Sequence, residues 1–236
     1  MRLKPTHPAL SEARTIHTKK VIDPATYKGN VLKSVADNIK LGNGSNVIVK
    51  GKWTGFPMVS LTLEERATCP RTCHHWVDCY GNGMAFGHRF KAGKALEDKI
   101  QEELSILAFK HRKGFVVRLH VLGDFYSVEY VEFWQRMLSM FPQLHIFGYT
   151  ARSNDPIGYN IAFLNAWFAD RCWIRSSKKE SEHGMAAIEI PNANSITCPQ
   201  QLGKTDACIT CGLCWSIKKP IHFVNHDNLN KKEMTV

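Results

Sequence analysis

Seven of the eight cysteines in this 236-residue chain fall into two groups whose spacings are typical of metal ligands. The first group is a C-x3-C-x5-C loop, made of Cys69, Cys73 and Cys79. The second group is a C-x2-C-x2-C run with one cysteine upstream: Cys198, Cys208, Cys211 and Cys214. Thiolates bind zinc ions and iron–sulfur clusters. The two groups therefore predict metal chemistry at two places in the chain.

The spacing of the second group favours a [4Fe–4S] cluster over zinc. Structural zinc sites usually use paired C-x2-C segments that a longer spacer separates. Three thiolates at steps of three residues are typical of ferredoxins, where a cysteine followed by proline is also a ligand. Cys198, which precedes Pro199, is the predicted fourth ligand. A zinc site and unligated thiols are the alternatives.

The first group has three cysteines, so a four-iron cluster there would keep one iron open for substrate or cofactor. One alternative is a zinc site completed by His74 or His75, and another is a cluster completed by a distant residue. Cys172, in a predicted strand, is a candidate for that distant ligand, although a lone strand cysteine is more often a buried small hydrophobe. The two groups could also share ligands, so the sequence does not decide whether one cluster or two form.

Charge is concentrated near the start of the chain. The formal net charge is +10, and residues 1–52 hold ten Lys and Arg against three Asp and Glu. This basic arm suggests a polyanionic partner, with nucleic acid the first candidate, while a solubilising terminus is the alternative. The composition, 44% apolar and 22% charged, excludes a fully disordered chain.

The sequence shows neither a membrane-spanning segment nor a secretory signal. No run approaches the ~20 apolar residues of a membrane span, and the N-terminus has no apolar signal region. We therefore expect no membrane partner and a cytoplasmic location, which is the host cytoplasm if the chain is phage-encoded. A reducing compartment also favours metal-binding thiols over disulfides.

Strands alternate with amphipathic helices along the middle of the chain. Strands are expected at 46–50, 58–63, 115–122, 144–149, 172–175 and 186–190, with helices near 96–107, 127–141 and 157–168. This alternation predicts an α/β fold with a parallel sheet, either a partial (β/α) barrel or an open doubly wound sheet. The expected organisation is a basic extended arm at 1–45 with a short helix near 31–39, an α/β body at 46–190, and a Cys-rich cluster segment at 191–236.

Polar residues follow several of the predicted strands. Arg118 and His120 alternate with apolar residues on one strand, and Gly123-Asp124 follows it. The next two strands end in further polar residues: Tyr149, Thr150, Arg152, Arg175, Ser176 and Ser177. Successive strand ends are where α/β folds bind ligands. We therefore expect these residues to line a site.

The three-cysteine loop follows a predicted strand, and its third cysteine is followed by an aromatic residue, Tyr80. This arrangement resembles the radical S-adenosylmethionine (SAM) superfamily. The usual spacing there is C-x3-C-x2-C, from which this loop departs. The chain is more similar to the phage gene-product-88-type family, which looks like a minimal relative of that barrel. The similar segments are 68–80, 118–127, 147–150 and 208–215.

The resemblance implies a radical-SAM-like partial barrel, a cluster held by the three-cysteine loop, and SAM at its open iron. Gly123 and Asp124 stand where that superfamily holds the amino group of SAM; the alternative is a plain strand-to-helix turn in which Asp124 caps the helix. An electron donor would be a further partner. The leading expectation is thus an iron–sulfur protein, with enzyme activity undecided, that acts on or with nucleic acid. A non-catalytic nucleic-acid-binding or redox-sensing protein with structural clusters, or a zinc-stabilised structural protein, are the alternatives.

Overall fold

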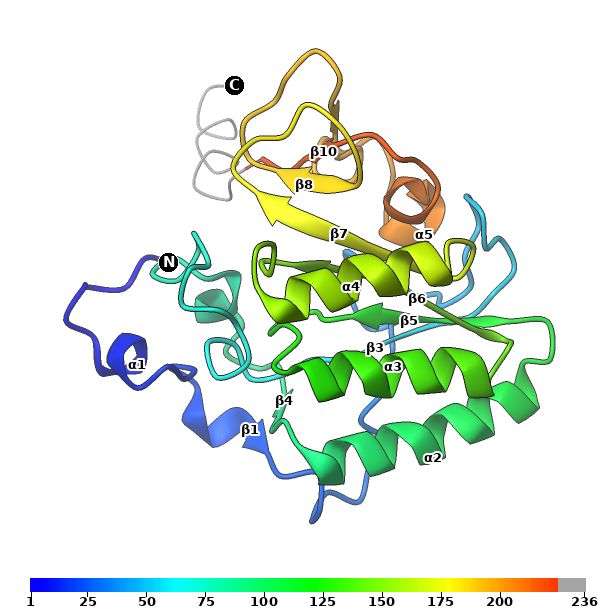
Figure 1. Cartoon of the computed structure of the whole chain (residues 1–236), viewed down its shortest axis with the longest axis horizontal. Coiled ribbons are helices and arrows are strands. Elements are labelled where there is room, and N and C mark those ends of the chain that lie inside the picture. Colours follow the sequence, from blue (N-terminus) through cyan, green and yellow to red (C-terminus); the bar gives the residue numbers. More distant parts are fainter. Residues whose placement is uncertain (225–236) are drawn as a thin grey trace.

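A mostly parallel sheet of eight strands forms the centre of the protein (Figure 1). The computed structural model describes residues 1–224. The strand order is β2-β3-β5-β6-β7-β8-β10-β9, and only β2 and β3 pair antiparallel. The bounds are β2 Lys33–Ser34, β3 Met58–Ser60, β5 Phe115–Leu119, β6 Leu144–Thr150, β7 Cys172–Lys178, β8 Ala186–Ile188, β9 Ile196–Thr197 and β10 Ile221–His222. The predicted α/β class with a parallel sheet is confirmed.

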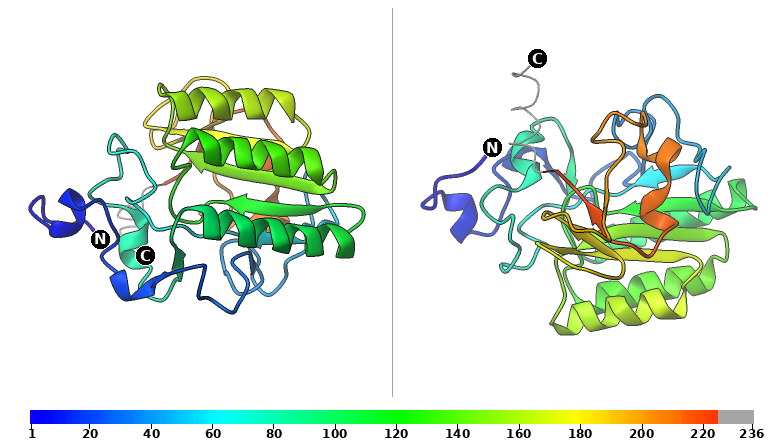
Figure 2. Two further views of the ribbon diagram at one scale, coloured as in Figure 1. Left: turned by 60° about the horizontal axis from the view of Figure 1, so that its bottom comes forward. Right: turned by 90° about the horizontal axis from the view of Figure 1, so that it is seen from above.

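Three long helices cover one face of this sheet (Figures 1 and 2). They are α2 (Lys94–Lys110), α3 (Val128–Met140) and α4 (Pro156–Trp167). The apolar residues Leu96, Ile100 and Leu104 of α2 are buried, and the Ser127 hydroxyl caps α3 by accepting a hydrogen bond from the backbone N–H of Tyr130. Because these helices all lie on one side, the doubly wound alternative is not the arrangement that forms.

The period of two along each strand separates two cores. Val117 of β5 and Ile174 of β7 pack beneath the helices in the first core. Val116 and Trp173 point to the opposite face, where the second core contains Trp215. The short helix α5 (Cys208–Cys211) and the 3₁₀ turn Leu213–Trp215 lie on this second face (Figure 2).

The N-terminal segment is folded onto the body. It contains α1 (Pro8–Ser11), a strand β1 (Val21–Ile22) that pairs with β4 (Arg89–Phe90), and β2 of the main sheet. The helix expected near 31–39 does not form. Instead, the Glu103 carboxylate of α2 accepts hydrogen bonds from the backbone N–H groups of Val31 and Leu32 at 2.6 and 2.8 Å. These contacts with a distant helix outweigh the local helical propensity.

Two other expectations change in detail. The strand expected at 46–50 is reduced to a single bridge between Val47 and Pro57. The C-terminal segment is continuous with the body, because its strands β9 and β10 extend the same sheet beyond β8; residues 225–236 of that segment lie outside the described part. Among residues 1–224, no helix has the length and apolar character needed to cross a membrane.

A candidate site at the carboxyl edge of the sheet

A cavity of about 530 Å³ lies where the parallel strands end. The predicted convergence of strand-end residues is found here, together with the three-cysteine loop. Its lining includes Cys69, Cys73, Cys79, Arg118, His120, Gly123, Asp124, Tyr149, Thr150, Ser177 and Glu189. The predicted residues Arg152, Arg175 and Ser176 do not line it. The cavity therefore brings the first cysteine group and the Gly123-Asp124 turn to one place.

The three thiols of the loop are close enough to influence one another. Burial raises the pKa of Cys69, and negative charge on Asp124, Cys73 or Cys79 raises it further. Burial likewise raises the pKa of Cys73 to about 11. Without a cation, these groups are therefore neutral thiols at neutral pH. A bound metal would be needed to hold them as thiolates.

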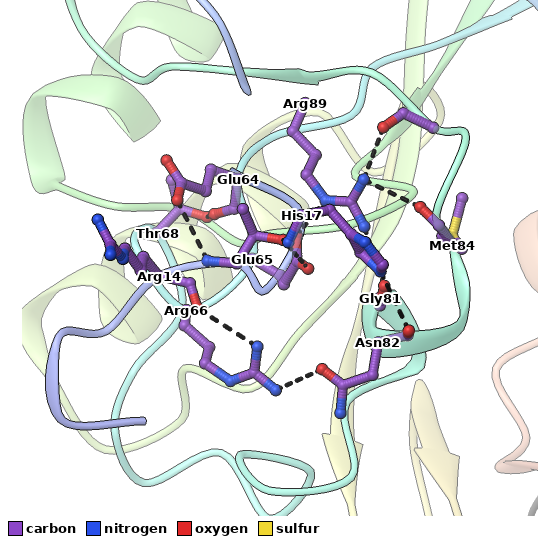
Figure 3. Close-up of polar contacts among 12 residues, drawn as sticks. Arg14, His17, Glu64, Glu65, Arg66, Thr68, Gly81, Asn82, Met84 and Arg89 are labelled. Atoms are coloured by element: carbon purple, nitrogen blue, oxygen red, sulfur yellow. Dashed lines mark hydrogen bonds and ion pairs between the residues drawn. The ribbon is translucent and has the colours of Figure 1, made fainter. Parts of the chain in front are cut away.

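A buried polar network holds this loop from both sides (Figure 3). Glu65 and Arg89, both fully buried, form an ion pair at 2.7 Å. The Arg89 guanidinium also donates to the carbonyls of Gly81, Met84 and Gly87. Before the first cysteine, Arg66 donates to the Asn82 side chain at 2.6 Å, beyond the third cysteine. The network joins the two ends of the loop and so limits how far the three thiols can move apart.

The N-terminal segment completes this network, which sequence reasoning did not predict. The Thr15 hydroxyl donates to Glu65 at 2.6 Å, and Asn82 donates to the backbone carbonyl of Met1 at 2.9 Å. Arg71, between the first two cysteines, donates to the carbonyl of Ser11. The basic segment is thus a structural cover for the cysteine loop. Contacts between residues this distant in the chain have no local sequence signal.

Gly123 and Asp124 form a tight turn at the end of β5. Gly123 has a φ of +83°, and a Cβ there would lie 2.6 Å from both Leu63 Cβ and Thr68 Oγ1. The Asp124 carboxylate accepts hydrogen bonds from Phe125 N, Thr150 Oγ1 and Ala151 N at 2.7, 2.7 and 2.8 Å. Ser127, and not Asp124, caps the following helix. Asp124 thus ties the ends of β5 and β6 together at the cavity wall.

Burial changes the protonation of two groups in this wall. It raises the pKa of Asp124 to about 6, although hydrogen bonds from Thr150, Ala151 and Phe125 oppose the shift. It lowers the pKa of His120 to about 3, with the positive charge of Arg118 adding to the effect. The His120 ring is therefore neutral at pH 7. Its Nδ1 is buried and has no hydrogen-bond partner within residues 1–224.

The second cysteine group assembles on the far face of the sheet. Charge on Cys198 raises the pKa of each of the other three thiols, Cys208, Cys211 and Cys214. Charges within that trio act on one another in the same way. The four predicted ligands, one of them far upstream of the C-x2-C-x2-C run, are therefore neighbours. Cys198 and Cys214 are buried and belong to the second core with Trp215.

Tyr149 and Arg118 link the two cysteine groups. Both line the cavity. The Tyr149 hydroxyl donates to Cys214 Sγ at 2.9 Å, and the Arg118 guanidinium lies over the Tyr149 ring, 4.6 Å from its centroid. Charge on Cys208 and Cys214 opposes the lowering of the Arg118 pKa by burial. The cavity and the four-cysteine group are therefore separated by these two side chains.

Arg175 is fully buried beside the four-cysteine group. Its guanidinium donates to the backbone carbonyls of Cys214 and Lys219 at 2.8 and 2.9 Å, and to that of Ile217. Within the described part of the chain, neither Arg175 nor Arg118 forms an ion pair with a carboxylate. A buried cation normally has a negative partner. Here the groups available for that role are the cysteines.

Cys172 belongs to neither group. It is 1% exposed and packs in the first core, beneath the helices, where its thiol contacts Asn165 Oδ1 at 3.3 Å. The two cysteine groups lie at the carboxyl edge and on the opposite face. Its side chain points away from both because successive strand residues alternate between faces. Cys172 is therefore a buried small hydrophobic residue and not a distant ligand of the three-cysteine loop.

Neither cysteine group forms a compact single-ion site. Among residues 1–224, the only three ligand atoms of His, Cys, Asp and Glu side chains within 4.8 Å of one another come from His74, His75 and Glu189. Four sulfurs around one zinc would lie about 3.8 Å apart, as the Zn–S length of about 2.3 Å requires. The expected alternative of a zinc site that joins the three cysteines to one histidine is therefore not assembled.

Comparison with known families identifies the chain. A family model, gene product 88, matches residues 28–195, which is more than half of the chain. The matched range includes the three-cysteine loop and the strand ends through β8, and it ends before Cys198. Comparisons with curated proteins and with solved structures found no match. The chain therefore belongs to the gene product 88 family, a phage-type family.

Proposed function

We propose that this chain is an iron–sulfur protein of the radical-SAM kind, with one [4Fe–4S] cluster at Cys69, Cys73 and Cys79 and a second at the four-cysteine group. The observation that carries this proposal is the composition of the cavity wall. Among the described residues, three thiols and no fourth line the cavity. Three thiolates on a four-iron cluster leave one iron for a ligand, and the cavity provides the room beside it.

The sulfur positions support a cluster over a single ion. A cluster spreads its thiolates over the corners of an inorganic core, so its cysteine sulfurs lie farther apart than those around one zinc ion. Both groups have thiols that influence one another's pKa, yet neither has three sulfurs within 4.8 Å. This combination fits a larger metal core in each group.

The environment of the second group suits an anionic cofactor. Four thiolates outweigh the positive charge of a [4Fe–4S] core, so the cluster carries net negative charge. Arg175 and Arg118 supply positive charge nearby, and the Tyr149 hydroxyl supplies a hydrogen bond to Cys214 Sγ. Hydrogen bonds to the ligating sulfurs tune the reduction potential of such clusters. Neutral thiols would leave the buried Arg175 without a negative partner.

The sheet supports a partial-barrel interpretation. From β3 through β5, β6, β7 and β8, the order of parallel strands follows the order of the chain, and the long helices all lie outside one face. A (β/α) barrel is built by continuing this pattern until the sheet closes. Barrels of this kind place their sites at the carboxyl ends of the strands, where this cavity lies.

When bound and reduced, such a cluster supplies a single electron to a ligand at its open iron. The chain's own residues would bind and orient that ligand, for which we propose SAM. A cavity of about 530 Å³ is within the range of cofactor sites. Gly123 lines the cavity, and the unpartnered Nδ1 of His120 offers a polar contact. Arg118 offers positive charge for a carboxylate.

Electrons would enter through the second group. Cys211 is the member on which a cationic side chain acts from the surface, because Lys50 lowers its pKa against the effect of burial. Lys50 and the neighbouring Lys40 and Lys52 are exposed. We propose that an electron donor with an acidic surface docks here. Tyr149 and Arg118 then lie between the entry cluster and the cavity.

Anaerobic reconstitution tests the proposal. The wild-type protein should be brown, absorb near ~400 nm and contain about eight irons and eight sulfides per chain, as two [4Fe–4S] clusters require. Cys69→Ala and Cys211→Ala should each lose about half of the iron. Cys172→Ala, the matched control in the first core, should keep all of it. Added SAM should change the electron paramagnetic resonance spectrum of wild type and not of Cys69→Ala.

The outcomes separate the parts of the proposal. Colourless protein with bound zinc would overturn the cluster assignment. Two clusters without a response to SAM, and without 5′-deoxyadenosine after reduction, would leave a redox or structural iron–sulfur protein and remove the SAM assignment. Loss of iron in Cys172→Ala would contradict the separation of the first core from the cysteine groups.

A further inference from the structure

Two histidines and a glutamate converge at the edge of the cavity without involving any cysteine. His74 and His75 are consecutive residues of the loop, and Glu189 follows β8. Glu189 Oε1 lies 2.9 Å from His74 Nε2 and 2.5 Å from His75 Nε2. Two ligands at about 2.0–2.1 Å from a metal are about 2.9 Å apart when the angle between them is about 90°. The 2.9 Å separation matches two ligand atoms that share one ion, and a bound ion would widen the 2.5 Å separation.

His74 and Glu189 are in close polar contact without the alignment of a good hydrogen bond. His74 Nε2 and Glu189 Oε1 are buried and 2.9 Å apart, but they do not face one another as a well-aligned donor and acceptor. Buried polar atoms are almost always paired. Two such atoms in contact, with a second imidazole 4.4 Å from the first between ring centroids, form a set of ligand atoms that one cation can share.

A second carboxylate, that of Asp78, lies beside the ring nitrogen of His75 that faces away from Glu189. His75 Nδ1 lies 3.3 Å from Asp78 Oδ1, while its Nε2 faces Glu189. A metal-bound imidazole commonly donates its other N–H to a carboxylate, which orients the ring and raises its basicity.

We infer that His74, His75 and Glu189 form a mononuclear site for a divalent first-row metal such as Zn²⁺ or Fe²⁺, distinct from both cysteine groups. Two imidazoles and one carboxylate are ligands that these ions accept. Three protein ligands leave a position open for water or a ligand, as in catalytic metal sites. His75 and Glu189 line the cavity, so a molecule in the cavity can reach the ion.

Zinc binding to the full-length, cluster-reconstituted and chelator-washed protein tests this site. We expect one equivalent of Zn²⁺ per chain by elemental analysis. Zinc-edge X-ray absorption should show nitrogen and oxygen ligands at about 2.0–2.1 Å, and not sulfur at about 2.3 Å. Glu189→Gln and His75→Ala should lose this zinc, and Asp78→Asn should bind it about 10–100-fold more weakly. His183→Ala, which alters an exposed histidine, is the matched control and should bind as wild type.

Each result supports or overturns the site independently of the iron–sulfur proposal. Equal zinc affinity in Glu189→Gln and wild type, or a shell of sulfur ligands only, would overturn it. If no cluster forms and the cysteines bind zinc instead, the X-ray absorption spectrum will show sulfur ligands, and these will remain in His75→Ala. The nitrogen and oxygen shell must still disappear in that variant. Circular dichroism of each variant, with Asp78→Asn as the mildest change, verifies that lost binding is not lost folding.

Discussion

Asp124 shows how burial sets the chemistry of single residues at this site. Its carboxylate has three hydrogen-bond donors, which would normally lower its pKa, but the carboxylate is 3% exposed and its pKa is about 6. The unfolded value is about 3.9. Folding therefore favours the protonated form. The stability that protonation provides is fully present below about pH 4 and is lost as the pH rises through about 6.

This shift predicts a pH-dependent difference between wild type and Asp124→Asn. The free energy of unfolding of wild type, relative to the variant, should rise by about 1 kcal/mol between pH 7 and pH 5. The asparagine side chain does not titrate, and its amide would face the Ala151 N–H, which gives the variant a constant cost of about 1–3 kcal/mol. Urea unfolding at several pH values measures both effects. A difference that is constant with pH would show that Asp124 titrates normally.

At the scale of elements, the three-cysteine loop has little regular structure of its own. Between β3 and β4 it contains only the 3₁₀ turn Tyr80–Gly83. Its shape depends on the buried pair of Glu65 and Arg89 and on the carbonyls that Arg89 binds. Removing one partner of such a pair leaves an uncompensated buried charge.

Arg89→Met should therefore lower the free energy of unfolding by about 3–5 kcal/mol. If the proposed clusters form, it should also reduce the iron at the three-cysteine loop and leave that at the four-cysteine group unchanged. Lys94→Met is the control, because it breaks an exposed ion pair with Asp98 and should change stability by less than about 1 kcal/mol. Chemical denaturation and iron analysis give the two readouts. Similar stabilities for both variants would contradict the structural role of the network.

The second cysteine group depends on one close backbone approach. Gly212, with a φ of +72°, ends α5, and a Cβ there would lie 2.2 Å from the backbone oxygen of Lys50. Gly203 has a similar φ of +66°, but no atom lies within 4 Å of the position of its Cβ. The two glycines therefore share the conformational requirement and differ in packing.

Comparison of Gly212→Ala with Gly203→Ala separates these two effects. Gly203→Ala should cost about 1 kcal/mol, the usual penalty of a left-handed alanine. Gly212→Ala should cost clearly more and should lose the iron of the four-cysteine group, because the segment around Lys50 must move away from α5. Thermal unfolding and iron counting provide the measurements. Equal costs would mean that the close approach to Lys50 is not required.

At the scale of the whole molecule, the basic N-terminal segment has a structural role, and the nucleic-acid contact expected from its charge must be tested separately from that role. It buries Val31 and Val35 in the two cores and covers the cysteine loop. Deleting residues 1–45 would therefore remove part of the fold together with the charge. Many of its lysines, however, remain exposed, among them Lys4, Lys19 and Lys28. Substitution of these side chains tests the proposed nucleic-acid contact without removing core residues.

If the segment binds nucleic acid, replacing Lys4, Lys19 and Lys28 by Gln should weaken binding to single-stranded DNA and RNA. The slope of log affinity against log salt should become shallower by about two to three, because fewer counterions are released. The control replaces three exposed lysines on or beside α2: Lys94, Lys110 and Lys113. Fluorescence anisotropy at several salt concentrations measures the slopes. Identical slopes for both triple variants would remove the segment as the binding surface.

Local patterns predicted much of the fold and part of the site. The apolar stripe of α2, the Ser127 cap of α3 and the strands β5, β6 and β7 follow from periodicity and capping, which act over a few residues. The assembly of Cys198 with the C-x2-C-x2-C run was predictable from spacing and its following proline. The fold of residues 1–45 was not predictable. Its backbone near Val31 forms hydrogen bonds with Glu103, a residue far along the chain, in place of the expected local helix.

The amino-acid sequence by itself determined that seven cysteines lie in two groups and that parallel strands carry polar residues at their ends. Only the tertiary structure decided that Tyr149 and Arg118 lie between the groups, that Cys172 faces the helices, and that Glu189 meets two histidines of a distant loop. The physical reason is range. Spacing and periodicity are encoded within a few residues, whereas these contacts depend on how strands pair and on which face of the sheet each side chain occupies.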